Sequence, residues 1–325
     1  MPEHYVSFWN VENLFDVRHA PDRSEKLQRA IGRELTGWTR AVLDRKISQL
    51  ARVVRSMNDA RGPDLLGVCE IENRRVLELL AGALSSLGRN YRIVHHDMSD
   101  RRGIDVAFIY DVDILQVETK DGKPLCFSHY IQKRVATRDL FQVNFLTAQG
   151  NRLFVIGNHW PARLGGQYSS EPYRMMAGET LAYFHQRIRE IHDDTHVAVL
   201  AMGDFNDEPL NRSLQEYAQA ERVRSKVTRA RSAKFLNVMW PLMGVGQGTH
   251  YYDNEPGMLD QFLASRGLVT GRNGIEVDVD SVEIVRHPDM VSSGTYPAPI
   301  RFGRGASMNR DGYSDHFPIA LRLHE

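Results

Sequence analysis

Residues 64–70 read Asp-Leu-Leu-Gly-Val-Cys-Glu and follow a Gly-Pro pair at positions 62–63. A short apolar run that begins after turn residues is typical of a buried β-strand. The run ends in Glu70, and a carboxylate at the mouth of a buried strand is costly unless it meets a cation. This stretch therefore predicts a strand inside the fold and a charged site at its end.

Short strand patterns and helical patterns alternate on both sides of this run. Further strands are predicted at residues 5–9, 91–95, 104–110, 141–146, 153–157, 196–202, 259–265 and 316–323. Helices are predicted at residues 40–57, 74–87 and 172–192, with a short one after Pro209. The turn at residues 149–151 predicts a hairpin, and hence antiparallel pairing. The mixture predicts an α/β fold in which sheets pack face to face with helices outside.

Composition places the chain among ordinary globular proteins. Of 325 residues, 42% are hydrophobic and 25% charged, which excludes collagen-like, disordered and membrane proteins. At this length roughly 75% of the unfolded surface can be buried, so a metal would serve chemistry rather than folding. The two cysteines are too few for a disulfide framework or a cysteine-based zinc site, and favour a reducing compartment.

The termini and the charge balance limit the location and the partners. The first residues lack a basic segment followed by an apolar run, so no signal peptide is visible and a cytoplasmic location is expected. The charge-free stretch 235–252 contains Pro241 and glycines, so we expect a loop and no membrane insertion. The 41 basic and 41 acidic residues exclude a broadly basic nucleic-acid coat protein.

Polar residues gather where the predicted strands end or begin. They are Asn10, Glu12 and Asn13; Glu70; Asn158 and His159; Asp204 and Asn206; Asp260 and Gln261; and Ser314, Asp315 and His316. Taken singly, the Asn and Asp residues are ordinary turn formers, and each histidine is more often a satisfied core or surface residue. As a set, oxygen donors with few imidazoles and no thiolate suit a hard cation such as Mg²⁺.

The ordered motifs resemble those of the endonuclease/exonuclease/phosphatase superfamily of metal-dependent phosphoesterases. The matching segments are Asn10-x-Glu12-Asn13, Cys69-Glu70-Ile71-Glu72-Asn73, Asn158-His159-Trp160-Pro161, Gly203-Asp204-Phe205-Asn206, Leu259-Asp260-Gln261-Phe262 and Ser314-Asp315-His316. The resemblance implies a four-layer sandwich of two mainly antiparallel sheets flanked by helices. Because the motifs span residues 10–316 and must meet at one site, we expect one catalytic domain over residues 1–325.

The resemblance also implies a metal site. Asn10 and Glu70 would form its main part, Glu12 would help through water, and Asp315 would lie nearby. Mg²⁺ or Mn²⁺ is the expected cofactor.

The remaining motif residues would carry the chemistry. Asp204 would orient or deprotonate the attacking water, and Asn206 would hold that water or a phosphate oxygen. His316 would bind the scissile phosphate, positioned by Asp260. His159 is a candidate acid for the leaving oxygen. Phosphoryl transfer needs a nucleophile, charge neutralisation and leaving-group stabilisation, which such a set supplies.

Substrate phosphate is expected to contact Asn158, Arg102 and Arg163. For Arg102 a charged turn is an equally good interpretation, and structural ion pairs would also explain Arg163 and Arg174. The basic run at residues 222–234 either contacts a phosphate backbone or forms a solvated face.

The expected function is a phosphodiester hydrolase, most simply a nuclease with DNA or RNA as its nucleic-acid substrate. The motif around His159 favours deoxyribonuclease-like branches over the repair-enzyme branch. Alternatives are a phosphatase or phosphodiesterase for a small molecule or lipid headgroup, and a catalytically silent binding module. No protein partner can be inferred.

Overall fold

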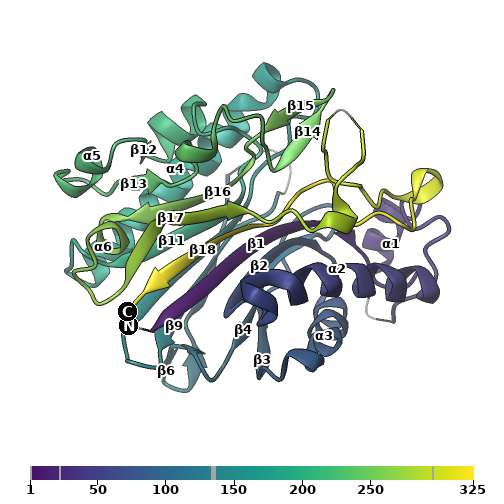
Figure 1. Ribbon diagram of the computed structural model, residues 1–325, viewed down its shortest axis with the longest axis horizontal. Helices are drawn as coiled ribbons and strands as arrows, with labels where there is room; N and C mark the ends of the chain where they lie inside the picture. The colour runs from purple at the N-terminus through teal and green to yellow at the C-terminus, as the bar shows by residue number, and fades with distance from the viewer. Residues whose placement is uncertain (1, 22, 133–136, 295) are drawn as a thin grey trace.

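The computed structural model describes residues 2–21, 23–132, 137–294 and 296–325. Within these ranges, two large sheets pack face to face with helices on their outer sides (Figure 1). The first, sheet A, has the strand order β17 (Glu276–Ile284), β18 (Ile319–His324), β1 (Glu3–Leu14), β2 (Leu65–Ile71), β4 (Asp105–Asp111) and β3 (Tyr91–His95). Its neighbours pair antiparallel except β1 and β2, which are parallel.

The second sheet, sheet B, is larger. Its order is β12 (Ala220–Glu221), β13 (Phe235–Asn237), β16 (Asp260–Ser265), β11 (Ala198–Asp204), β10 (Arg152–His159), β9 (Leu140–Thr147) and β5 (Leu115–Val117), with β8 (Cys126–His129) also on β9. The pairs β12/β13 and β10/β11 are parallel, and the others are antiparallel. Two small hairpins, β6 (Thr119–Lys120) with β7 (Lys123–Pro124) and β14 (His250–Tyr252) with β15 (Glu255–Gly257), lie outside both sheets. The predicted sandwich of mainly antiparallel sheets is confirmed.

Helices cover the outer faces of both sheets. On sheet A lie α2 (Arg40–Ala60) and α3 (Arg74–Ala83), and on sheet B lies α4 (Gln167–Ile191). Shorter helices are α1 (Glu25–Ile31), α5 (Arg224–Thr228) and α6 (Arg266–Thr270). The apolar stripe of α2 is buried, and Asn73 caps α3 by accepting the Val76 amide at 3.1 Å, as its position predicts.

Several boundaries differ from the prediction. Strand β1 continues to Leu14 because the residues beyond Trp9 remain buried and pair again with β2 after an irregularity. Strand β18 begins at Ile319, while His316 forms an isolated bridge with His250. The helix predicted from 172 begins at Gln167, and the one after Pro209 is a single π-helical turn, Ser213–Tyr217.

Residues 235–252 form short strands and a 3₁₀ turn joined by loops, as expected. In the described ranges, no helix has the length and apolar character needed to cross a membrane.

The sheets approach closely near the ends of their parallel strand pairs. A Cβ on Gly157 would lie 2.6 Å from Val106 Cγ1, so only glycine allows this spacing. Parallel pairing aligns Asn10 with Cys69 in sheet A, and His159 with Asp204 in sheet B. The polar strand ends predicted from the sequence therefore meet at one end of the sandwich.

A buried histidine between α4 and sheet B gives the fold a testable pH dependence. The His185 ring stacks on Phe235 with centroids 4.0 Å apart. Burial, with Arg189 nearby, lowers the pKa of His185 from 6.5 to about 3. As the pH falls, the unfolded chain therefore binds this proton before the folded chain does. The contribution of neutral His185 to the free energy of unfolding is complete above pH 6.5 and is lost as the pH falls toward 3.

We expect the shifted pKa of His185 alone to lower the free energy of unfolding by about 2 kcal/mol when the pH falls from 7.5 to 5. Urea unfolding at both pH values should show a pH effect smaller by this amount in His185→Phe than in the wild type. Because other histidines are common to both proteins, their contributions cancel. An equal pH effect in the two proteins would show that His185 is not held neutral.

Candidate active site

A buried histidine–aspartate pair joins the two sheets at the polar end. His316 Nδ1 lies 2.7 Å from Oδ2 of Asp260, which begins β16 and is fully buried. Burial opposes a charge on His316, but the carboxylates of Asp260 and Asp204 raise its pKa well above 6.5. These carboxylates favour the imidazolium form of His316, and Asp260 holds its ring in a fixed orientation.

Asp204 is the carboxylate that faces this imidazolium at the end of β11. Its Oδ2 lies 3.9 Å from His316 Nε2 and 3.1 Å from Asn10 Nδ2, while Oδ1 accepts the Asn206 amide at 2.9 Å. Burial and the neighbouring Asp260 raise the pKa of Asp204 to about 7, although His316 opposes the shift. A pKa near neutrality suits a group that must accept a proton.

His159 completes this group from the end of β10. Its Nε2 lies 3.8 Å from Asp204 Oδ2 and 3.7 Å from Glu70 Oε1. Burial first, and then the charges of Arg138 and Arg102, lower the pKa of His159 well below 6.5. These surroundings favour the neutral ring, and the role of His159 as an acid for the leaving oxygen stays a prediction.

Asn10, Glu70 and Asp315 carry the oxygen atoms of the expected divalent-cation site, and Asn10 Oδ1 also accepts the Glu12 amide at 3.0 Å. Burial and the charge of Glu70 raise the pKa of Asp315, so these carboxylates repel one another in the absence of a cation. All three residues offer oxygen donors, which Mg²⁺ and Mn²⁺ prefer. In the described chain, Asp204, Asp260 and His316 also present ligand atoms within 4.8 Å of one another, but there the proton on His316 already supplies the positive charge.

Glu12 differs from its expected role of helping to hold the metal through water. Its Oε1 accepts Arg301 Nε at 3.0 Å and Nη2 at 2.8 Å, and its Oε2 accepts the Phe302 amide at 2.8 Å. Both carboxylate oxygens are thus engaged by the segment between β17 and β18. Glu12 holds Arg301 at the edge of the site, where Nη2 also lies 3.4 Å from Asp315.

Asn158 also differs from its expected contact with substrate phosphate. It is fully buried; its Nδ2 donates to the Ile156 carbonyl at 2.8 Å, and its Oδ1 accepts Trp160 Nε1 at 2.9 Å. Since both ends of the carboxamide are used within the protein, Asn158 holds the Trp160 loop in place rather than facing a ligand.

The two arginines expected at the phosphate lie at the site's edge. Arg102 donates to Asn13, next to Glu12, and lies 3.4 Å from Glu34. Arg163 donates through Nε to the Asn206 carbonyl at 2.8 Å. By contrast, Arg174 is fully buried and paired with Asp207 at 2.8 Å, so it is structural.

Some residues of the site were not predicted. The ring of His250 lies 4.7 Å from that of His316, centroid to centroid. Lys46 is fully buried on α2 and donates to the Glu12 carbonyl at 2.7 Å, and burial lowers its pKa to about 8. Lys46 could have been found, because it interrupts the apolar stripe of the predicted helix. Arg301 and His250 lie in segments without a clear helix or strand pattern.

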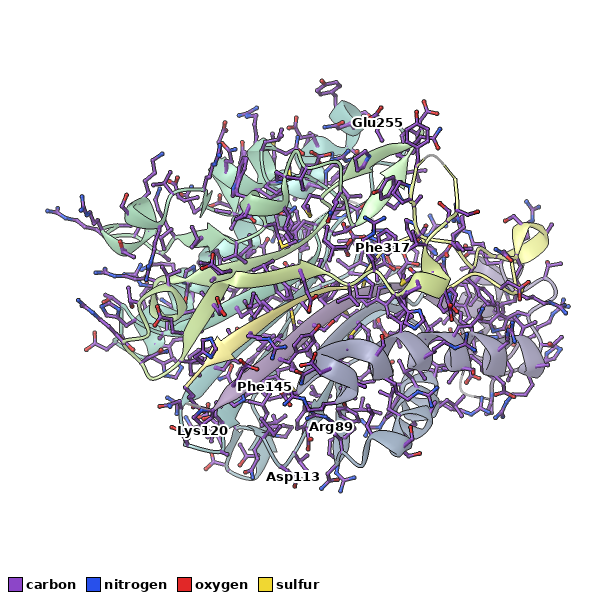
Figure 2. The ribbon with its side chains drawn as sticks, viewed as in Figure 1. Arg89, Asp113, Lys120, Phe145, Glu255 and Phe317 are labelled. Carbon is purple, nitrogen blue, oxygen red and sulfur yellow. The ribbon has the colours of Figure 1, made fainter. Side chains whose placement is uncertain are left out.

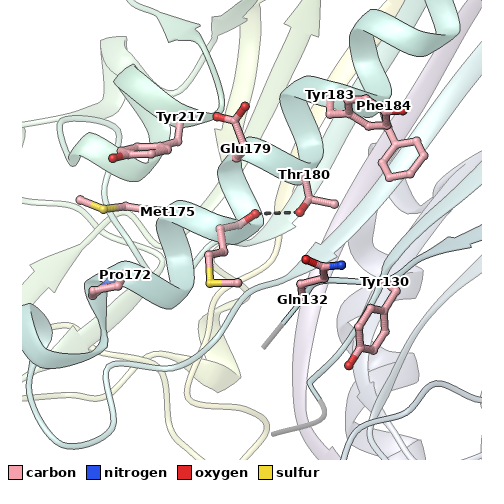
Figure 3. A pocket seen from close by; sticks show the side chains of 10 residues that line it. Tyr130, Gln132, Pro172, Met175, Glu179, Thr180, Tyr183, Phe184 and Tyr217 are labelled. Carbon is pink, nitrogen blue, oxygen red and sulfur yellow. Dashed lines mark hydrogen bonds between the residues drawn. The ribbon is translucent and has the colours of Figure 1, made fainter. Parts of the chain in front are cut away.

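Two other features lie away from this chemistry. The basic run at 222–234 is at the opposite end of sheet B, near α5, where Lys234 pairs with Glu221 at 2.5 Å. A surface pocket of about 680 Å³ on α4 contains none of the site residues (Figure 3). Its lining includes Tyr130, Met175 and Tyr183.

Comparisons with known proteins agree with this fold. An endonuclease/exonuclease/phosphatase family protein from Bacteroides thetaiotaomicron is 14% identical, with a TM-score of 0.58 over 99% of this chain and 95% of that one. The human nocturnin catalytic domain, solved with bound sulfate, is 15% identical, with a TM-score of 0.57 over 99% of this chain and 94% of that one. A mannosyl-6-phosphatase from B. thetaiotaomicron is 15% identical, with a TM-score of 0.56 over 98% of this chain and 99% of that one.

At these identities the solved structures establish the shared fold alone. A search of curated proteins found no match to the sequence. The sequence profile described as the Endonuclease/Exonuclease/phosphatase family matches residues 5–325, which is nearly the whole chain. The chain therefore belongs to the endonuclease/exonuclease/phosphatase family, whose members hydrolyse phosphoesters.

Proposed function

We propose that the protein is a Mg²⁺- or Mn²⁺-dependent phosphodiesterase that cleaves nucleic acid. One observation carries the proposal: a buried imidazolium, His316, and a carboxylate of near-neutral pKa, Asp204, face each other at 3.9 Å. A cation that binds phosphate oxygen beside a base that accepts a proton from water is the pair that phosphodiester hydrolysis needs.

In the proposed mechanism, His316 donates a hydrogen bond from Nε2 to a nonbridging oxygen of the scissile phosphate. Asp260 keeps the proton on the ring and fixes its orientation through Nδ1. Asp204 accepts the proton of the attacking water, and its orientation is set by Asn10 and the Asn206 amide. A divalent cation bound by Asn10, Glu70 and Asp315 would supply neutralisation of the charge on the phosphate and leaving oxygens.

Exposed cations at the site's edge support a nucleic-acid substrate. The guanidinium groups of Arg102, Arg163 and Arg301 are partly exposed there, while Glu12 and Asp207, which pair with two of them, are buried. Cations facing outward suit a polyanionic backbone. The zero net charge implies a salt dependence smaller than that of a broadly basic nucleic-acid-binding protein.

The proposed activity is tested with a panel of phosphoesters. Purified protein is offered plasmid DNA, single-stranded DNA, RNA and bis(p-nitrophenyl) phosphate, each with Mg²⁺, Mn²⁺ or EDTA. We expect cleavage of nucleic acid that requires the metal, and loss of that cleavage in Asp204→Ala because the change removes the proposed proton acceptor.

Turnover of the small ester alone would instead assign a small-molecule or lipid-headgroup phosphoesterase. No metal-dependent turnover of any phosphoester would contradict both assignments.

The histidine–aspartate pair gives a second prediction. We expect His316→Ala and Asp260→Asn each to lower kcat at least ~100-fold, because either change removes the oriented imidazolium. The partly exposed pair His324–Asp278, at 3.4 Å, provides a matched control, and Asp278→Asn should leave kcat unchanged. Circular dichroism would verify that each variant is folded. A near-normal kcat in folded His316→Ala would show that the role of His316 is wrong.

A further inference from the structure

His250 stands beside the catalytic pair without a role in the mechanism above. The hairpin β14–β15 carries it, with Glu255 at the outer tip and Phe317 near the base in Figure 2. The Phe317 amide donates to the Thr249 carbonyl at 2.7 Å, and the Asp260 amide donates to Thr249 Oγ1 at 3.0 Å. The hairpin is thus fixed to both members of the catalytic pair, and it holds the His250 ring against His316.

Arg301 reaches the neighbour of His316 from the side of sheet A, because its Nη2 lies 3.4 Å from Asp315. The neighbouring Phe302 is fully buried, packs edge-on against Trp38 with centroids 5.7 Å apart, and donates its amide to Glu12. The Arg301 side chain is nevertheless 63% exposed. Over the described ranges, its Nη1 has no hydrogen-bond partner, so this edge of a rigidly anchored guanidinium is available to a ligand.

Arg163 approaches from the side of sheet B. Its Nε donates to the carbonyl of Asn206, whose amide in turn bonds to Asp204. Its Nη2 is buried, lies 3.5 Å from Asp207 Oδ1, and makes no hydrogen bond within the described parts of the chain. This nitrogen is shielded from solvent, but the Arg163 side chain as a whole is 29% exposed, so the rest of the guanidinium provides a second cation at this edge of the site.

The charges around His250 agree with this placement. Burial, and then the charges of His316, Arg301 and Arg163, lower the pKa of His250 to about 3. The ring is therefore a neutral hydrogen-bonding group surrounded by cations. Two of the carboxylates that pair with these cations, Glu12 and Asp207, are buried, whereas Asp315 is partly exposed.

We propose that Arg301, His250 and Arg163 form a second anion subsite beside His316, which binds a further phosphate of the substrate. The proposal rests on the proposed function, in which His316 binds the scissile phosphate. In a polynucleotide this second anion is the neighbouring backbone phosphate; in a small molecule it would be the second phosphate of a bisphosphate. Guanidinium groups are suited to either because they bind phosphate through paired hydrogen bonds.

The test compares substrates that differ by one phosphate. Wild-type protein with Mg²⁺ or Mn²⁺ is given the dinucleotide dTpdT and its forms phosphorylated at the 5′ or the 3′ end. We expect kcat/KM to be roughly tenfold higher for one phosphorylated form, because one charge-assisted contact is gained. In Arg301→Gln and His250→Ala this ratio should fall toward one.

Arg304→Gln is the matched control, because Arg304 lies on the same segment and pairs with Glu34 at 2.9 Å; its ratio should match the wild type. A sugar monophosphate and bisphosphate form a parallel pair of substrates, and a preference confined to that pair would assign the second phosphate to a small molecule.

Equal kcat/KM for all three dinucleotides and for both sugar phosphates would overturn the subsite and leave the proposed function standing. If no phosphoester is hydrolysed, the proposed function fails instead. The subsite is then judged by calorimetric titration of dTpdT and its phosphorylated forms, with Mg²⁺ present. The subsite is supported if a phosphorylated form binds more weakly to Arg301→Gln than to Arg304→Gln. Equal binding to the two variants overturns the subsite.

Discussion

The hydrogen bond between His316 and Asp260 is the constraint on which the site depends. His316 stands just before β18 of sheet A and Asp260 begins β16 of sheet B, so their 2.7 Å contact fixes the two sheets relative to each other at the polar end. Asn10 and Asp204 form a second contact between the sheets at 3.1 Å. Removing one partner of such a buried charge pair would leave the other charge uncompensated, so structure and chemistry share these residues.

The sequence predicted the elements that local patterns determine. The run at 64–70 forms β2, and Asn73 caps the following helix as its position indicates. Where tertiary pairing decides, the prediction failed at the ends: β1 extends to Leu14 because β2 lies beside it, and β18 begins late because His316 is held by a bridge to His250. A pattern along the chain contains no information about partners that are distant in sequence.

For the candidate site, residue type was predictable but orientation was not. Glu12 and Asn158 occupy motif positions, yet each side chain is used by hydrogen bonds within the protein. Glu12 is engaged because Arg301, from a distant part of the chain, lies beside it. A buried carboxylate is costly unless it is paired, so it forms an ion pair with a neighbouring cation. A motif therefore identifies where a functional group lies, whereas the direction of the group depends on what the rest of the fold places beside it.

The distribution of charge explains how a protein with no net charge can suit an anionic substrate. Glu12, Asp207 and Asp260 are buried, whereas the guanidinium groups of Arg301 and Arg163 are partly exposed, so the cations determine the field that a ligand meets at the edge of the site. With 41 basic and 41 acidic residues, the field at long range is weak. Recognition must then occur at short range, through oriented hydrogen bonds. The anchoring of Arg301 by a buried neighbour serves this requirement, because a guanidinium held in place loses little entropy when it binds.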